Sequence, residues 1–334
     1  VARGFARVGA GREQEPAMII QPMSDTASAS FTATRLNGIC PLPHLGVIRA
    51  RGEDAARFLQ GQLTQDVQHL PPGQARLAAL CNPKGRMLAS FWVLRRADDE
   101  LLLITSADTL AATLKRLSMF VLRARLKLSD ATSELALRGL IGDATISIAA
   151  GANQTSADSQ NDAVSTIPLP AADGAPRALW LGPVGTPAPA AASLSSADWL
   201  AAEVRAGVAR VTQPVVEAFV PQMLNYESVD GVHFQKGCYP GQEVVARSQF
   251  RGAIKRRAFV GQVAGAAQAG QDVFGAADPS QPVGLIAQAA PVPGGTAVIA
   301  ALRLDALKQP LAVGRADGPP LSGLHIPYAL REDI

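Results

Sequence analysis

The segment 233–252, HFQKGCYPGQEVVARSQFRG, contains the residues of this chain that are best suited to do chemistry. Cys238 lies between Gly237 and Gly241, and Lys236 precedes it by two positions. A cysteine reacts as its thiolate, and in an extended segment the Lys236 ammonium would share a face with the thiol and favour that form. The glycines would let the backbone approach a partner closely. A small side chain buried in a tight turn is the other interpretation of this segment.

Trp199 is one of three tryptophans and lies near the start of the apolar-patterned segment 195–211. An indole ring can stack on a flat heteroaromatic ligand, but it can equally anchor a core. The basic run RSQFRGAIKRR (247–257) has Phe250 interleaved and could bind RNA phosphates or a chain of carboxylates. Positive charges on a solvated strand edge would look the same.

Several elements must position these residues, and their mixture indicates an α+β fold. Residues 75–96 form two strand-like runs around Asn82-Pro83-Lys84-Gly85, a turn signal that places Lys84 and Arg86 at a hairpin tip. Further strands are predicted at 45–52 and 100–106, and helices are predicted from Gly52, after Ser106 and over 195–211.

Composition along the chain predicts its organisation. Residues 1–37 are read as a disordered tail, 38–250 as an α+β core of two interleaved subdomains, and 251–334 as a C-terminal β-barrel. Within the core, about 151–195 is rich in Ala, Ser, Asp, Gly and Pro, which favours a flexible insert rather than core structure.

The overall composition narrows the class of protein. Of 334 residues, 48% are hydrophobic, and the net charge is only +3, which argues against a dedicated nucleic-acid binder. No apolar run has the roughly 18 residues of a membrane span, so we expect no membrane association. Three cysteines without a C-x-x-C pattern, and four histidines without ligand spacing, favour neither a disulfide framework nor a metal site. Free thiols suit a reducing, cytoplasmic location.

Four motifs in this order resemble the YgfZ family of folate-binding proteins, relatives of the glycine-cleavage T-protein. They are FLQGQLTQDV (58–67), CNPKGRML (81–88), FVPQMLN (219–225) and KGCYPGQEVVAR (236–247). The resemblance implies a ring-like T-protein fold whose centre binds tetrahydrofolate or a derivative. It also implies a role in assembling or repairing iron–sulfur client proteins, including radical enzymes that modify tRNA.

The resemblance also implies roles for particular residues. Cys238 would be the functional thiol, with Lys236 beside it, and Trp199 would contact folate. Leu45 stands where the family has a second aromatic residue. The implied folate-binding residues are Trp199, Leu45, Arg86, Tyr239 and Gln242.

Catalysis by the T-protein reaction is not expected. T-proteins carry an acidic pair just beyond the glycine turn, whereas this chain reads Arg86-Met87-Leu88-Ala89 there. A missing general acid or base costs about 10²–10⁴-fold in rate. A folate-dependent one-carbon (aminomethyl) transferase and an RNA-binding module remain the alternative functions.

Overall fold

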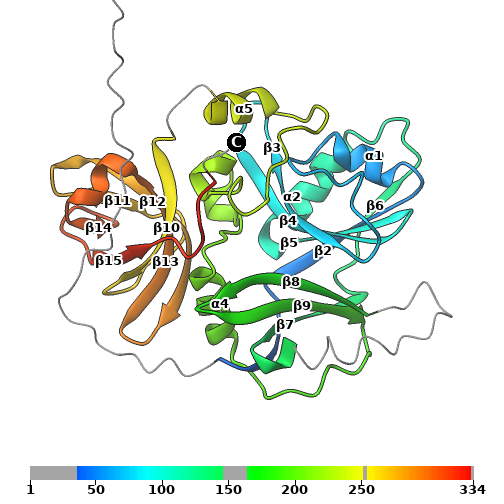
Figure 1. Cartoon of the computed structure of the whole chain (residues 1–334), viewed down its shortest axis with the longest axis horizontal. Coiled ribbons are helices and arrows are strands. Elements are labelled where there is room, and N and C mark those ends of the chain that lie inside the picture. Colours follow the sequence, from blue (N-terminus) through cyan, green and yellow to red (C-terminus); the bar gives the residue numbers. More distant parts are fainter. Residues whose placement is uncertain (1–35, 146–163, 251–253, 332–334) are drawn as a thin grey trace, which may run out of the picture. The chain divides into compact units, whose positions relative to one another are not determined.

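The computed structural model describes residues 36–145, 164–250 and 254–331, which belong to one compact unit, Arg35–Ile334 (Figure 1). The expected tail therefore lies, up to residue 35, outside the described residues. The unit contains two antiparallel sheets, a closed barrel and a few short helices. Its strands are β1 Gly38–Pro41, β2 Leu45–Arg51, β3 Ala75–Cys81, β4 Met87–Ala97, β5 Glu100–Ser106, β6 Lys127–Asp130, β7 Leu135–Ile141, β8 Ser165–Ala172, β9 Ala175–Pro183, β10 Arg256–Val263, β11 Asp272–Gly275, β12 Asp278–Val292, β13 Gly295–Arg303, β14 Leu311–Val313 and β15 Pro320–His325.

The helices are short and join or cover the sheets. Among the described residues, no helix combines the length and apolar character needed to cross a bilayer. The helical segments are α1 Ala55–Gln60, α2 Ala107–Ser118, α4 Ser196–Arg205, α5 Gln242–Phe250, and the 3-10 turns η2 Gln213–Val215, η3 Pro221–Leu224 and η4 Leu304–Lys308.

The five-stranded sheet has the order β3-β4-β5-β2-β6 and is buried on both faces. Alternate residues of a strand point to opposite sides. Leu101 and Leu103 of β5 therefore join the core under α1 and α2, while Leu102 and Ile104 join the core on the other face. Double burial explains why β5 reads as a continuous apolar run rather than an alternating one.

The four-stranded sheet has the order β1-β7-β9-β8. Although β1 and β2 are consecutive in the chain, they lie in different sheets, so the two sheets interleave in sequence. Residues 151–163 of the expected flexible insert lie outside the described residues. For the rest of it the expectation needs correction, because β8 pairs with β9 and β9 pairs with β7. Their buried residues, such as Ile167 and Leu179, contribute to the core despite the Ala- and Pro-rich surroundings.

The C-terminal strands close into a barrel of order β10-β13-β12-β11-β14-β15. Closure leaves no strand edge unpaired, which is how small antiparallel barrels avoid edge-to-edge association. Together with the two antiparallel sheets and their helices, the barrel confirms the predicted α+β class with a C-terminal β-barrel.

Helix α4 connects these parts. Its Ser195 N-cap accepts a hydrogen bond from the Asp198 amide at 3.0 Å, which fixes the start of the helix. The helix contacts β12 and β13 of the barrel and also β1 and β8 of the four-stranded sheet. A side chain on α4 can therefore face a space between several elements.

Candidate functional site

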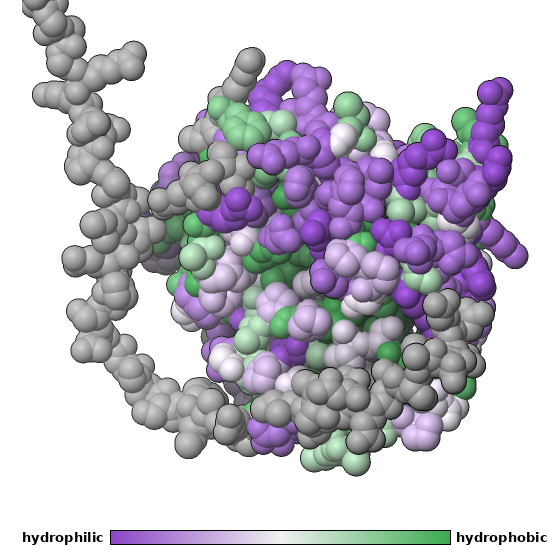
Figure 2. Space-filling model, turned by 45° about the vertical axis from the view of Figure 1, so that its right-hand side comes forward, coloured by the Kyte–Doolittle hydropathy of each residue, from purple (hydrophilic) through white to green (hydrophobic). Residues whose placement is uncertain are grey.

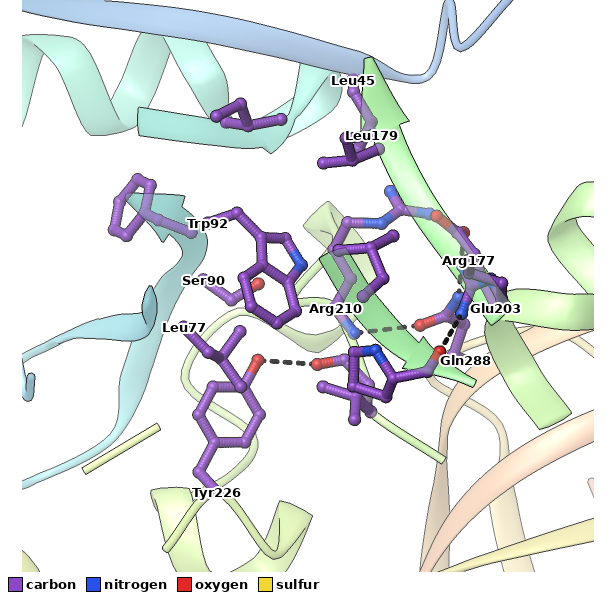
Figure 3. A pocket seen from close by; sticks show the side chains of 16 residues that line it. Leu45, Leu77, Ser90, Trp92, Arg177, Leu179, Glu203, Arg210, Tyr226 and Gln288 are labelled. Carbon is purple, nitrogen blue, oxygen red and sulfur yellow. Dashed lines mark hydrogen bonds and ion pairs between the residues drawn. The ribbon is translucent and has the colours of Figure 1, made fainter. Parts of the chain in front are cut away.

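A cavity lies where β4, β5, β9, α4 and the segment 208–210 meet (Figure 3). In this structure the cavity volume is about 60 Å³, well below the roughly 300–1,000 Å³ of small-molecule pockets, so a ligand larger than a few atoms needs its walls to move apart. Figure 3 shows the Trp92 ring of β4 on one side, and Glu203 of α4 with Gln288 of β12 on the other. The cavity thus combines an aromatic wall with a charged wall.

Glu203 is the centre of the charged wall. Its Oε2 accepts hydrogen bonds from Arg210 Nη2 at 3.1 Å and from Gln288 Nε2 at 3.4 Å. Its Oε1 accepts one from Trp199 Nε1 at 3.1 Å and lies 3.5 Å from His44 Nε2. A buried carboxylate with this many partners has one fixed orientation.

The electrostatics of the cavity keep Glu203 ionised. Burial opposes its charge, but Arg210, His44 and Arg177 outweigh that effect and hold the pKa of Glu203 well below its ordinary value. Arg177 is itself buried, and burial lowers its pKa to about 10, so it remains a cation at neutral pH. The cavity therefore presents a fixed anion flanked by two cations.

The remaining walls are mostly apolar. Leu45, Leu179 and Ile104 line the cavity with Trp92, which is only partly buried. At the base, the Tyr226 hydroxyl donates to the Ala209 carbonyl oxygen at 2.7 Å. If these walls move apart, a flat heteroaromatic ring can lie against them with its polar edge toward Glu203.

Sequence reasoning missed Trp92, Glu203 and Arg210. One signal was available, because Trp199 and Glu203 are four residues apart and so share one face of the helix. A carboxylate on the buried face of an amphipathic helix needs a partner, which would have pointed to Glu203. Nothing in the sequence marked Trp92, since an aromatic residue in a strand is normally core.

The structure does not place Trp199 as expected. Its side chain is 0% exposed and belongs to the core, and it does not line the cavity. One ring face packs so closely on β7 that a Cβ added at Gly139 would lie 2.5 Å from the ring. The Arg177 guanidinium lies 4.5 Å from the ring centroid. Trp199 therefore supports Glu203 and Arg177 from behind and offers no free ring face to a ligand.

The other implied folate-binding residues divide into two groups. Leu45 lines the cavity, whereas Arg86, Tyr239 and Gln242 do not. Arg86 lies at the β3–β4 hairpin tip and donates from Nη1 to the Ala218 carbonyl oxygen at 2.6 Å. Tyr239 is buried in the loop before α5, and Gln242 is the first residue of that helix. These three residues belong to a different region from the cavity.

Cys238 lies in this second region and its side chain is exposed. The expected pairing with Lys236 needs correction, because the Lys236 ammonium donates to the carbonyl oxygens of Gln60 and Leu63. It also lies 4.9 Å from the centroid of the Tyr239 ring. Burial lowers the pKa of Lys236 to about 8. Lys236 thus anchors the loop, and its hydrogen bonds are directed at the backbone.

The two glycines of the loop, Gly237 and Gly241, differ in how closely other atoms approach them. Gly241 has φ +81°, and a Cβ there would lie 2.4 Å from the Asn82 carbonyl oxygen, so glycine is required for the hairpin tip to dock on the loop. Gly85, at the hairpin tip, has φ +71°, and a Cβ there would lie 3.0 Å from the Cβ of Val244 in α5. Around Gly237, by contrast, nothing lies within 4 Å of a Cβ position. The loop therefore docks through Gly241 and leaves the side next to Cys238 open.

The other two thiols are buried. Burial raises the pKa of Cys40 to about 11 and that of Cys81 to about 12. Both would remain protonated at neutral pH, and neither is accessible. Cys238 is the exposed thiol of this chain.

The basic run 247–257 does not form a continuous cationic surface. Arg257 is buried and donates to Glu227, and Arg247 pairs with Glu243 on the same helix. Of the remaining cations, Arg251 lies outside the described residues. The observation that motivated an RNA-binding module is therefore weakened by these pairings.

Comparison with known proteins agrees with this architecture. Residues 6–168 match the GCVT N-terminal domain family. The crystal structure of the glycine cleavage system aminomethyltransferase T from Bartonella henselae superposes with a TM-score of 0.57 at 15% identity. It covers 86% of this chain and 85% of that chain, and at this identity it shows a shared fold.

Closer relatives carry the name tRNA-modifying protein YgfZ. The relative from Cronobacter sakazakii is 33% identical over 255 residues, covering 70% of this chain and 73% of its own. The relative from Edwardsiella ictaluri is 34% identical over 251 residues, covering 72% and 73%. With this identity and coverage, and with the T-protein-like fold, the chain belongs to the YgfZ family.

Proposed function

We propose that the cavity binds a reduced folate, tetrahydrofolate or a derivative. The observation that carries this proposal is the buried, ionised Glu203 carboxylate at the cavity wall. A pterin presents a ring N–H and an adjacent amino group along one edge, a pair of donors that a carboxylate accepts well. The cations that flank Glu203 keep it charged without a ligand. Because both of its oxygens already accept hydrogen bonds, the pterin donors would replace the weakest of these, the 3.4 Å bond from Gln288 among them.

The residues that line the cavity support the same ligand. Trp92, Leu45 and Leu179 provide apolar surface against which a bicyclic ring can pack, and Trp92 offers the aromatic face. Trp199 takes part indirectly, since its Nε1 hydrogen bond holds Glu203 in place.

We propose that the folate-loaded protein acts as an accessory factor for iron–sulfur enzymes, including enzymes that modify tRNA. The names of the relatives support the connection with tRNA modification. Cys238 is the residue that would meet a client protein, because its thiol is exposed beside an open part of the loop. A reducing cytoplasm would keep this thiol free.

An aminomethyl transferase is supported less well. The stretch 86–89 supplies no acid, and Met87 and Ala89 are fully buried. Glu203 is a poor general acid or base, because its ion pairs keep it charged well below neutral pH.

Calorimetric titration with tetrahydrofolate tests the binding proposal. We expect a Kd of about micromolar for the wild type. Glu203→Gln keeps the shape but removes the charge, and should weaken binding at least ~10-fold, since hydrogen bonds to a charged group are worth about 1.5–3 kcal/mol. Glu243→Gln, on the exposed face of α5, is the matched control and should bind like the wild type. Equal affinity in the Glu203 and Glu243 variants would refute the cavity as the folate site.

The accessory role is tested in a strain that lacks the protein. We expect the wild type to restore the activity of an iron–sulfur tRNA-modifying enzyme and Cys238→Ser to fail, although the variant should still bind folate. Full restoration by Cys238→Ser would exclude the thiol from the function.

A further inference from the structure

A second concave region lies at the tip of the β3–β4 hairpin. The hairpin-tip cleft is lined by Asn82, Pro83, Lys84, Arg86, Arg116 and Glu217. It is open to solvent and shares no lining residue with the folate cavity. Figure 2 shows one face of the molecule, on which hydrophilic surface surrounds hollows with hydrophobic walls.

The cleft carries an excess of positive charge. Lys84, Arg86 and Arg116 face a single carboxylate, that of Glu217, whose Oε1 accepts from Asn82 Nδ2 at 2.8 Å. Within the described part of the chain, neither Lys84 nor Arg116 forms an ion pair. Three cations and one carboxylate leave the cleft with a net positive charge, which favours an anionic partner.

Apolar side chains extend the cleft at the end of α2. Met119, Phe120 and Leu122 lie within the four residues that follow α2 and are 59%, 47% and 86% exposed. Arg116 joins the two parts, because it lines the cleft and its Cζ lies 6.0 Å from the Phe120 ring centroid. Exposed apolar residues bordered by charges are typical of protein interaction surfaces.

Glu217 is held in an unusual backbone conformation. Its φ is +63°, which is uncommon for a residue other than glycine. The Glu217 amide donates to the Met87 carbonyl oxygen at 2.8 Å, and the Met87 amide donates to the Phe219 carbonyl oxygen at 2.8 Å. These bonds fix the carboxylate at the cleft, where it can accept from a backbone or side-chain donor of a partner.

We propose that the hairpin-tip cleft and the exposed residues 119–122 form a docking surface for a protein segment that carries carboxylates beside an apolar side chain. The carboxylates pair with Lys84 and Arg116, and the apolar side chain packs on Phe120 and Leu122. RNA fits less well, because Met119 and Leu122 are aliphatic and Phe120 is the one exposed ring in this segment on which a base could stack.

The surface lies beside the exposed thiol. The hairpin tip packs on Gly241, three residues after Cys238, so a segment docked in the cleft lies next to the thiol loop. The identification of the docked segment with an iron–sulfur client rests on the proposed function, whereas the docking surface itself does not.

Selection from a displayed library of random peptides on the full chain tests the surface. We expect the enriched peptides to combine Asp or Glu with Leu, Ile or Phe. Their affinity should fall at least ~10-fold in the Lys84→Glu/Arg116→Glu variant and in Leu122→Ser. The side chains of Lys84 and Leu122 are exposed, so their substitution should leave folding unaffected. The thermal unfolding temperature of each variant checks that it is folded.

Matched controls come from the barrel. Lys308→Glu changes an exposed cation, and Leu304→Ser changes a leucine that is 41% exposed, both on η4. The selected peptides should bind these variants like the wild type. No enrichment, enrichment of basic peptides, or binding that survives the cleft substitutions would overturn the proposal.

A labelled single-stranded RNA library titrated in parallel gives the competing outcome. RNA binding that is lost in Lys84→Glu/Arg116→Glu would overturn the proposal in favour of a nucleic-acid surface. Titration of the same variants with tetrahydrofolate separates this proposal from the folate proposal. Absence of folate binding by the wild type would refute only the folate site, because the cleft and the cavity share no residue.

Discussion

The cavity and the loop that carries Cys238 (residues 236–241) differ in how far their reactive and charged groups are exposed. In the cavity, Glu203 and Arg210 are largely buried, and their opposite charges pair at 3.1 Å. In the loop, the Cys238 thiol is exposed, and the Lys236 ammonium donates its hydrogen bonds to backbone carbonyl oxygens. Under the function proposed above, the cavity would hold a small molecule in a fixed geometry, and the loop would offer its thiol to a protein partner. Substitutions in the two regions should therefore have contrasting effects.

Thiol labelling gives the largest expected contrast. In the native protein we expect one of the three cysteines to react rapidly with a maleimide, and Cys238→Ser to abolish this reaction. Cys40 and Cys81 should react at least ~10³-fold more slowly than Cys238. Exposing a core thiol requires local unfolding, which costs several kcal/mol. Mass spectrometry identifies the labelled residue, and denatured protein, which should take up three labels, is the control. Rapid native labelling of Cys40 would contradict the burial of the four-stranded sheet.

Removal of the cavity carboxylate should have the largest effect on stability. Glu203→Ala leaves Arg210 and Arg177 buried without their partner, and should lower the free energy of unfolding by about 3–5 kcal/mol. Glu243→Ala removes an exposed ion pair with Arg247 and should change it by less than about 1 kcal/mol. Chemical denaturation measures both, and equal losses would remove the distinction between the two regions.

Two glycine substitutions sharpen the comparison at the level of packing. Gly139→Ala pushes a methyl group into the Trp199 ring and should cost about 1–3 kcal/mol by overpacking. Gly237→Ala, in the thiol loop, meets no atom within 4 Å and should be close to neutral. Thermal unfolding distinguishes the two. A neutral Gly139→Ala would mean that Trp199 is free to move, and the ring would again be a candidate for ligand stacking.

The smallest expected effect is a pH dependence from Lys236. Burial lowers its pKa from 10.5 to about 8, so between pH 8 and pH 10.5 the unfolded chain binds the extra proton. Stability should therefore rise with pH across this window, because it rises wherever the unfolded state binds more protons. We expect a gain of about 1–2 kcal/mol for the wild type relative to Lys236→Met, after allowance for partial exposure. A flat or falling difference between the two proteins would show that the ammonium is not desolvated.

Much of the fold could be predicted from local patterns. The hairpin over 75–96 follows from two apolar runs around Asn82-Pro83-Lys84-Gly85, and the observed strands flank that turn. The composition of the Ala- and Pro-rich stretch predicts a flexible insert, yet β8 and β9 pair there. A strand needs few strongly apolar residues when it can add to an existing sheet, and that context is not local.

The sequence by itself determined that Cys238 sits in a glycine-flanked turn, that α4 is amphipathic and that the chain ends in a barrel of short strands. Only the tertiary structure decided which side chains meet. It placed Trp199 inside the core, directed Lys236 away from the thiol, and brought Glu203 to Arg210 and Trp92 from separate elements. Periodicity reports which face of an element is buried, but the partner across that face depends on contacts between residues far apart in the chain.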